Sequence, residues 1–252
     1  CKSRMCRTRS KLSDIRGIMN YVVCLKYGTK YSAEYVNKLY NGVKRNLTIP
    51  FEFVCYTEDA RGIDNGIRIE PIPLVPGVEG WWYKPMFFNP KLGLDGTILF
   101  FDLDVVVFRN IDNFFTYNPN QFCIIRDFNR HVVRNYNKFN SSVFRLTTGQ
   151  HSHVYTEFMQ DPSIPIKRFP GDQDWLRAKI PDQTYVYWPD EWIQSYKWEM
   201  RNKPKFNRMP RGQRDFETNG DPIVLNDTSV AVFHGEPLMH NCKDKWVRAN
   251  WI

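Results

Sequence analysis

Several kinds of segment and motif are absent from this 252-residue chain. It has no run of about 18 apolar residues, so no membrane-spanning helix is expected, and its N-terminus lacks the apolar core of a signal peptide. It has no G-x-S-x-G, Walker or G-x-G-x-x-G sequence, so a hydrolase elbow, a P-loop and a dinucleotide-binding loop are not indicated. No CxxC pair points to structural zinc, and no dense cysteine framework points to a disulfide scaffold.

The cysteines that are present occur mostly in apolar surroundings. Cys24, Cys55 and Cys123 lie in apolar, strand-like runs, where a buried free thiol is the common case. Persistent disulfides belong to oxidising compartments. We therefore expect free thiols in these strands and a reducing, cytoplasmic location.

Positive charge is concentrated at the N-terminus. The net charge is +8, and six Lys or Arg residues against one Asp occur in the first sixteen positions. We expect residues 1–19 to form a basic tail, as a disordered solubilising end rather than as a segment that touches acidic lipid at a membrane surface, and residues 20–252 to form a single domain. Since the body carries little excess positive charge, no nucleic-acid partner is expected.

The beginning of this domain has a strand, helix, strand pattern. Residues 20–25 are an apolar strand, residues 32–46 carry apolar side chains at helical spacing, and residues 51–56 form a second strand. Residues 67–72 alternate and predict a third strand. Short connections in this order are typical of an α/β fold with a mostly parallel sheet flanked by helices. Residues 189–222 show little periodicity and are expected to form a long flexible loop or lid.

Two aspartates interrupt the most apolar stretch of the chain. Residues 97–108 have the pattern of one buried strand, with Asp102 and Asp104 inside it. Ionised carboxylates there would cost several kcal/mol each unless something pairs with them. Side chains two residues apart on a strand point the same way, so both could face one divalent cation. The alternative is a pair of solvated aspartates at a strand end.

Other polar segments are expected to meet these aspartates. Ligands bind at the carboxyl ends of parallel strands, and residues 26–28 and 57–59 both follow predicted strands. His234 ends a late apolar strand and precedes Gly235, where a backbone can approach a ligand closely. Oxygen ligands with one imidazole suit Mn²⁺ or Mg²⁺ better than structural zinc. The candidate ligands of such an ion are Asp102, Asp104 and His234.

Four motifs that follow the strand, helix, strand start resemble the glycosyltransferase A (GT-A) fold and, within it, the family 8-like nucleotide-sugar glycosyltransferases. They are Phe101-Asp102-Leu103-Asp104 (a DxD motif), Asn140-Ser141-Ser142-Val143, Asp172-Gln173-Asp174 and Phe233-His234-Gly235-Glu236-Pro237. The resemblance implies a Rossmann-like nucleotide-binding half and an acceptor-side half. It also implies transfer of a sugar from a nucleotide-sugar, usually a UDP-sugar, to a hydroxyl of a glycan, protein or lipid-linked acceptor, in glycan or polysaccharide synthesis, with Mn²⁺ on the diphosphate.

The resemblance further implies roles at the nucleotide end of the donor. Asp102 would hold the ribose and help to hold the metal, which Asp104 and His234 would ligate. Lys84 would lie against the ribose or a phosphate. A metal together with a Lys or Arg would stabilise the charge that develops on the leaving diphosphate. The residues implied for the base pocket are Lys26, Tyr27 and Asp59.

At the sugar end, Asn140 and Ser141 would contact the donor sugar. The residues implied to flank the reacting carbon are Asp172, Gln173 and Asp174. Similar enzymes carry a lysine for the diphosphate a few residues after the His-Gly pair, but residues 236–240 of this chain contain none. Lys243, Lys245 or a basic residue of segment 201–214 could serve instead.

Two other functions remain open from the sequence. A sugar-phosphate nucleotidyltransferase uses a similar sheet and carboxylates, but the chain has no Gly-rich Arg-Lys signature after its first strand. A non-enzymatic carbohydrate-binding protein would use the aromatic loops and the basic tail. That function leaves the buried aspartates unexplained.

Overall fold

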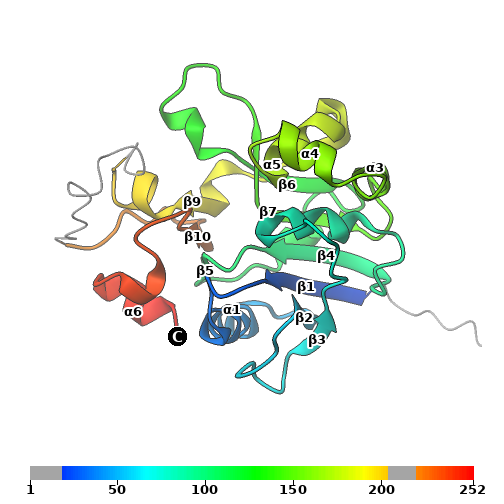
Figure 1. The fold of residues 1–252 in the computed structure, drawn as a ribbon. Coiled ribbons are helices and arrows are strands. Elements are labelled where there is room, and N and C mark those ends of the chain that lie inside the picture. Colours follow the sequence, from blue (N-terminus) through cyan, green and yellow to red (C-terminus); the bar gives the residue numbers. More distant parts are fainter. Residues whose placement is uncertain (1–18, 204–219) are drawn as a thin grey trace, which may run out of the picture.

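Two β-sheets form the centre of the structure (Figure 1). The computed structural model describes residues 19–203 and 220–252. Its larger sheet has seven strands in the order β3-β2-β1-β4-β7-β6-β8, and its smaller sheet has three in the order β5-β10-β9. Helices cover both faces of the larger sheet, and most of its strands are parallel to a neighbour. The predicted α/β class is confirmed.

The strand, helix, strand start is also confirmed. β1 pairs in parallel with both β2 and β4, and β2 pairs in parallel with β3. Helix α1 packs its buried residues Val36, Leu39 and Val43 into the core on one side of this half-sheet. The elements are β1 (Met19–Lys26), α1 (Ala33–Asn46), β2 (Glu52–Thr57), β3 (Arg68–Pro71) and β4 (Gly96–Phe101).

The second half of the large sheet is mainly antiparallel. β7 pairs antiparallel with β4 and β6, and β8 pairs in parallel with β6. Short helices precede and follow these strands. The elements are η1 (Gly80–Phe88), α2 (Asn113–Thr116), β6 (Phe122–Arg126), η2 (Phe128–His131), β7 (Phe139–Thr147), α3 (His153–Phe158), α4 (Ser163–Arg168), α5 (Asp172–Lys179), η3 (Asp182–Thr184) and β8 (Tyr185–Tyr187).

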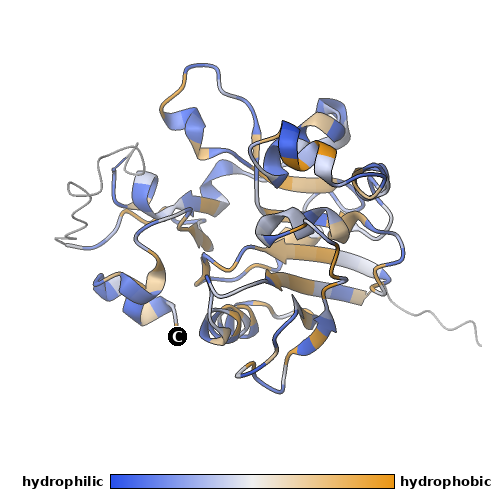
Figure 2. Cartoon of the chain, in the orientation of Figure 1, coloured by the Kyte–Doolittle hydropathy of each residue, from blue (hydrophilic) through white to orange (hydrophobic). Residues whose placement is uncertain are grey.

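The large sheet is buried on both faces. Along β1, Val22 and Cys24 belong to one apolar cluster, and Tyr21 and Val23 belong to the other. Figure 2 shows the strands largely in the hydrophobic colour and the outer helices and loops largely in the hydrophilic one. The three cysteines that were expected to be free thiols, Cys24, Cys55 and Cys123, are free and buried. Cys242 is free and buried as well.

The prediction of one strand over residues 97–108 was wrong. β4 ends at Phe101, and β5 (Val105–Val107) begins the smaller sheet. Between them the chain turns through residues 102–104, where the Asp102 N–H donates a hydrogen bond to the Ser142 carbonyl over 2.8 Å. Two successive buried strands produce one uninterrupted apolar run, because neither has a solvent-facing side. The aspartates therefore lie in the link between two sheets.

The prediction of a flexible loop over residues 189–222 was also wrong for its first part. β9 (Ile193–Ser195) pairs in parallel with β10 (Val230–Val232), which pairs antiparallel with β5. Ile193 and Tyr196 are buried in the main core. A three-residue strand is too short to show a periodic pattern. The flanking elements are η4 (Asp190–Trp192), η5 (Tyr196–Met200), η8 (Met239–Asn241) and α6 (Lys245–Asn250).

Two expectations fall on parts of the chain that the structure does not describe. The rest of the proposed loop, residues 204–219, and nearly all of the basic tail, residues 1–18, are outside the described residues. Among the helices formed by residues 19–203 and 220–252, none has the length and apolarity needed to cross a membrane.

Candidate active site

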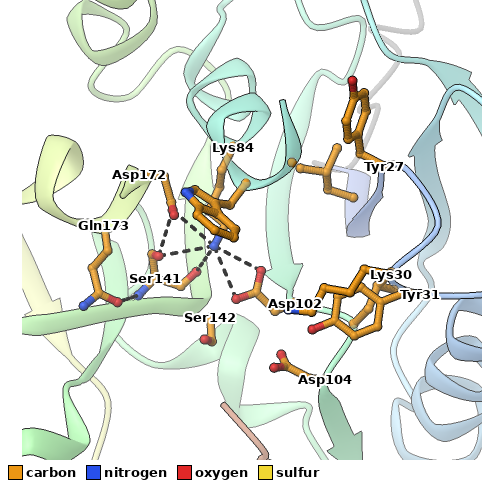
Figure 3. A pocket seen from close by; sticks show the side chains of 14 residues that line it. Tyr27, Lys30, Tyr31, Lys84, Asp102, Asp104, Ser141, Ser142, Asp172 and Gln173 are labelled. Carbon is orange, nitrogen blue, oxygen red and sulfur yellow. Dashed lines mark hydrogen bonds and ion pairs between the residues drawn. The ribbon is translucent and has the colours of Figure 1, made fainter. Parts of the chain in front are cut away.

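A pocket of about 310 Å³ opens at the carboxyl ends of β1 and β4 (Figure 3). Its volume falls within the range of small-molecule sites. Side chains reach it from the loop after β1, from η1, from the link between β4 and β5, from the start of β7 and from the first turn of α5. The predicted site residues that line it are Tyr27, Lys84, Asp102, Asp104, Ser141, Asp172 and Gln173.

Lys84 lies at the centre of the polar side chains in this pocket (Figure 3). Its Nζ is 3.0 Å from Asp102 Oδ1 and 3.2 Å from Asp172 Oδ2, and it donates to Ser141 Oγ over 3.2 Å. The ammonium comes from η1, which is anchored in the core by Met86, Phe87 and Phe88. Burial lowers the pKa of Lys84, but the charges of Asp102 and Asp172 outweigh burial and the net pKa is raised. Lys84 is therefore positively charged.

The pocket has more negative than positive charge around Lys84. Three carboxylates, those of Asp102, Asp104 and Asp172, line it together with one buried ammonium. Burial raises the pKa of Asp102 to about 6, since the opposing effect of Lys84 is countered by the charges of Asp104 and Asp172. Carboxylates that repel one another in this way gain from a hard divalent cation. The oxygen donors of Asp102 and Asp104 thus fit Mn²⁺ or Mg²⁺.

His234 is close to Asp104 along the backbone, but its side chain makes other contacts. The Phe233 N–H donates to the Asp104 carbonyl over 2.9 Å. The His234 ring is stacked on Phe128 with 5.2 Å between centroids, and its Nε2 is 2.5 Å from Ser195 Oγ. Among residues 19–203 and 220–252, no group of three or more His, Cys, Asp or Glu side chains is arranged to hold a metal ion. The structure therefore does not assemble His234 with the two aspartates as such a group.

The protonation of His234 follows from its surroundings. Burial, and then the positive charge of Lys197, lower the pKa of His234 to about 3. The imidazole is neutral at physiological pH, which is the form that a metal requires.

The first turn of α5 sends its three polar residues in different directions. Asp172 Oδ2 accepts a hydrogen bond from Ser141 Oγ over 2.9 Å, and Gln173 Oε1 accepts one from the Ser141 N–H over 3.0 Å. Asp174 pairs instead with Arg177 over 3.3 Å and lines a separate cavity of about 490 Å³. The structure thus brings Asp172 and Gln173 into the pocket with Ser141, but it does not bring Asp174 there.

Several other predicted site residues do not line the pocket. Lys26 Nζ donates to the Asp59 carbonyl over 3.3 Å, and the Asp59 carboxylate pairs with Arg61 over 2.8 Å. Asn140 Oδ1 accepts from the Ser142 N–H over 2.8 Å, which shapes the start of β7. Gly235, like His234, belongs to the turn after β10.

Lys30 and Tyr31 line the pocket but were not predicted from the sequence. Both follow the end of β1 within five positions, and that proximity was the available signal. Burial, and then the charges of Asp104 and Asp102, raise the pKa of Tyr31. Its phenol is therefore uncharged, and Figure 3 shows it on the same side of the pocket as both aspartates. The exposed Trp81 also lines this pocket.

Some candidates for diphosphate binding are already engaged elsewhere. Arg201 pairs with Asp244, both buried. Lys205 and Arg208 are outside the described residues. Lys243 lines a third cavity beside α6 and the chain end, separate from the pocket that holds the aspartates.

No protein-family model and no curated protein matches the chain. Solved structures do match it. The glycosyltransferase GlyE of Streptococcus pneumoniae TIGR4 matches with a TM-score of 0.61 and 10% identity over 93% of this chain and 60% of GlyE. The galactosyltransferase LgtC, in complex with donor and acceptor sugar analogs, matches with a TM-score of 0.57 and 15% identity over 92% of this chain and 93% of LgtC.

The bifunctional glycosyltransferase WbbM matches with a TM-score of 0.55 and 13% identity, over 90% of this chain but only 48% of WbbM. The chain thus spans about 60% of the length of GlyE and about half that of WbbM. Similarities at these identities show a shared fold. The chain has the GT-A glycosyltransferase fold, as its motifs predicted.

Proposed function

We propose that this chain is a metal-dependent glycosyltransferase that moves a sugar from a UDP-sugar to an acceptor hydroxyl. The observation that carries the proposal is the group formed by Asp102, Asp104 and Lys84. It lies in a pocket at the carboxyl ends of parallel strands, on a fold shared with glycosyltransferases. Ligands of open α/β sheets bind at this edge.

Asp102 and Asp104 are the proposed holders of Mn²⁺ or Mg²⁺, and His234 remains the predicted third ligand. When bound, the ion would neutralise the negative charge of the donor diphosphate and of the leaving nucleotide. Without a cation, the two aspartates would repel a diphosphate. This is why we expect donor binding to depend on metal.

The aromatic residues of the loop after β1 suit the nucleotide base. Tyr27 and Tyr31 both line the pocket on the side away from α5 (Figure 3). Aromatic faces stack with bases and tolerate any of them. Lys84, which is held in place by two carboxylates, would lie beside the ribose or a phosphate.

The opposite side of the pocket suits the transferred sugar. Ser141, Asp172 and Gln173 form one hydrogen-bonded group there. Breaking the glycosidic bond gives the sugar oxocarbenium character, so an adjacent carboxylate such as that of Asp172 would stabilise it. The acceptor would be a hydroxyl of a glycan, protein or lipid-linked sugar. LgtC, which has the same fold, binds donor and acceptor sugar analogs.

The test is release of UDP from a panel of UDP-sugars with Mn²⁺. We expect the wild type to release UDP from at least one donor, and Asp104→Asn to lower that rate by about 100-fold or more, because charge stabilisation in the transition state is lost. Asp95→Asn is the matched control. It makes the same chemical change at an exposed residue beside the opposite end of β4 and should keep the wild-type rate.

Equal rates for wild type and Asp104→Asn across the panel would overturn the proposal. Pyrophosphate release from a nucleoside triphosphate and a sugar phosphate would instead assign the chain to the nucleotidyltransferases. Absence of any metal-dependent nucleotide binding would favour a carbohydrate-binding protein.

A further inference from the structure

Trp81 presents a large apolar surface to solvent at the edge of the pocket. It is 53% exposed, whereas each of the other seven tryptophans of the chain is buried or only partly exposed. Folding normally buries most of a tryptophan. Trp81 also lines the pocket that holds Lys84 and Asp102. Exposed apolar surface at such a place marks a contact with a ligand.

The helix η1 sets the position of this indole. In a 3₁₀ helix, residues three apart lie on the same face, and Trp81 and Lys84 are three apart in η1. Trp82 and Tyr83, between them, are buried in the core and hold the helix in place. Since Lys84 is buried at the centre of the pocket and Trp81 is exposed, the indole lies on the same face as the ammonium but nearer to the mouth of the pocket.

Trp81 lies at the end of the pocket that suits the sugar. A Cβ built on Gly171, the residue before α5, would be 3.6 Å from Trp81 Nε1, which is an ordinary van der Waals distance. The next residue is Asp172, which forms the hydrogen-bonded group with Ser141 and Gln173. The two tyrosines proposed to bind the base are on the side away from α5 (Figure 3). The indole is therefore next to the place of bond breaking.

The polar edge of this indole has no partner in the protein. In the described residues, 19–203 and 220–252, no group accepts a hydrogen bond from Trp81 Nε1. A pyranose ring offers both of the contacts that remain open, because its C–H face is apolar and its hydroxyls accept hydrogen bonds. An aromatic ring with an N–H suits such a ligand. The hydroxyl of a serine or threonine side chain has no comparable flat face.

Of the two substrates, the acceptor fits this surface better. In the proposed function, the transferred sugar contacts Ser141, Asp172 and Gln173 inside the pocket. Once the donor fills the pocket, the acceptor can approach the reacting carbon only from the mouth. Trp81 is the exposed aromatic surface at that mouth and is adjacent to α5.

We propose that Trp81 stacks on a pyranose ring of the acceptor, and hence that the acceptor is a glycan rather than a protein hydroxyl. This inference rests on the proposed function and narrows its range of acceptors. The indole binds the ring, and the hydroxyl that attacks would belong to that ring or to its neighbour in the glycan.

The experiment uses the UDP-sugar from which the wild type releases UDP fastest in Mn²⁺. The acceptor probes are the methyl glycosides of glucose, galactose, mannose and N-acetylglucosamine. We expect at least one probe to raise UDP release above the rate with water alone. For that probe, Trp81→Ala should raise the KM by about three- to tenfold, because a stacking contact is lost, while the KM for the UDP-sugar stays the same. Trp81→Phe keeps a ring and should raise the KM for the probe less.

Two further variants control this comparison. Ile164, in α4, is 60% exposed and does not line the pocket. Ile164→Ala therefore removes exposed apolar surface elsewhere and should keep both KM values. Trp81→Leu retains apolar bulk without a ring, so it carries the test if Trp81→Ala does not fold, and it should raise the KM for the probe as much as Trp81→Ala.

The outcomes distinguish this inference from the proposed function. If the wild type releases UDP from no UDP-sugar, the proposed function fails, and this inference with it. If UDP is released but no methyl glycoside raises the rate, only the present inference is overturned. It is also overturned if a probe is used as acceptor and its KM is the same in Trp81→Leu and wild type. A rise in the KM for the UDP-sugar that equals the rise for the probe would assign Trp81 to the donor sugar instead.

Discussion

Lys84 connects both acidic parts of the pocket. It lies between Asp102 and Asp172 at 3.0 and 3.2 Å, with 4% of its side chain exposed. Removing one partner of a buried ion pair leaves the other charge uncompensated. We expect Lys84→Met to lower the free energy of unfolding by about 3 kcal/mol at pH 7, measured by urea denaturation. The exposed Lys91→Met is the control, and an equal effect of both variants would contradict the account.

Asp112 illustrates a carboxylate that stabilises the fold away from the site. It accepts hydrogen bonds from the Thr48 N–H and hydroxyl over 2.8 and 2.5 Å, which ties the loop after α1 to α2. Burial raises the pKa of Asp112, but the bonds from Thr48 outweigh burial and the net pKa is lowered. A lowered folded-state pKa means that this stabilisation is present above about pH 4 and is lost as the pH falls further.

Asp112→Asn should therefore reduce the free energy of unfolding by about 1 kcal/mol at pH 7 and by much less at pH 3. Denaturant titrations of variant and wild type at both pH values measure this. The exposed Asp64→Asn serves as control. A difference between Asp112→Asn and wild type that is as large at pH 3 as at pH 7 would contradict the assignment.

Individual residues were predictable where their chemistry conflicted with their surroundings. Asp102 and Asp104 were found because carboxylates in an apolar run need a partner, and the structure places both in the pocket. The buried Lys197 was not found, because a lysine among tryptophans in a segment without periodicity gives no sign of being buried. Asp174 shares a motif with Asp172, yet a helical turn of roughly 100° per residue separates their directions.

At the scale of elements, α1 approaches β5 closely at one glycine. A Cβ on Gly42 would lie 2.9 Å from the backbone oxygen of Val107. Alanine improves helix propensity by about 1 kcal/mol over glycine, but here the clash should dominate. We expect Gly42→Ala to destabilise the protein by roughly 1–3 kcal/mol, measured as a lower midpoint of thermal unfolding.

Asn41→Ala is the matched control for this prediction, since Asn41 is a partly exposed position of the same helix. It gains propensity without a backbone clash and should be neutral or slightly stabilising. Stabilisation by Gly42→Ala would show that α1 and β5 do not pack this closely.

Elements were predictable in proportion to their length and pattern. The helix over residues 32–46 and the strands before and after it were predicted correctly. A 14-residue helix and strands of six to eight residues are long enough for the spacing of their apolar side chains to be recognised in the sequence. β5, β9 and β10 have three residues each, which is less than two full alternations. Their pairing depends on partners far apart in the chain, so the small sheet was not visible in the sequence.

At the scale of the whole molecule, the two sheets share one apolar cluster. Val22 and Leu99 of the large sheet and Val105, Ile193 and Val230 of the small sheet belong to it. A shared core predicts a single cooperative unfolding transition for residues 20–252, which were expected to form one domain. Calorimetry should give one peak whose calorimetric and van't Hoff enthalpies agree, and two separable transitions would contradict the single domain.

The central claim is that the pocket around Asp102 and Asp104 binds a nucleotide-sugar donor through a divalent cation. Calorimetric titration of UDP into the wild type, with Mn²⁺ and then with EDTA, tests it most directly, with Asp104→Asn and Asp95→Asn measured alongside. The account predicts saturable binding to the wild type and Asp95→Asn in Mn²⁺, weakened by at least about tenfold in EDTA or by Asp104→Asn. Binding that is equal in Mn²⁺ and EDTA, or unaffected by Asp104→Asn, would contradict it.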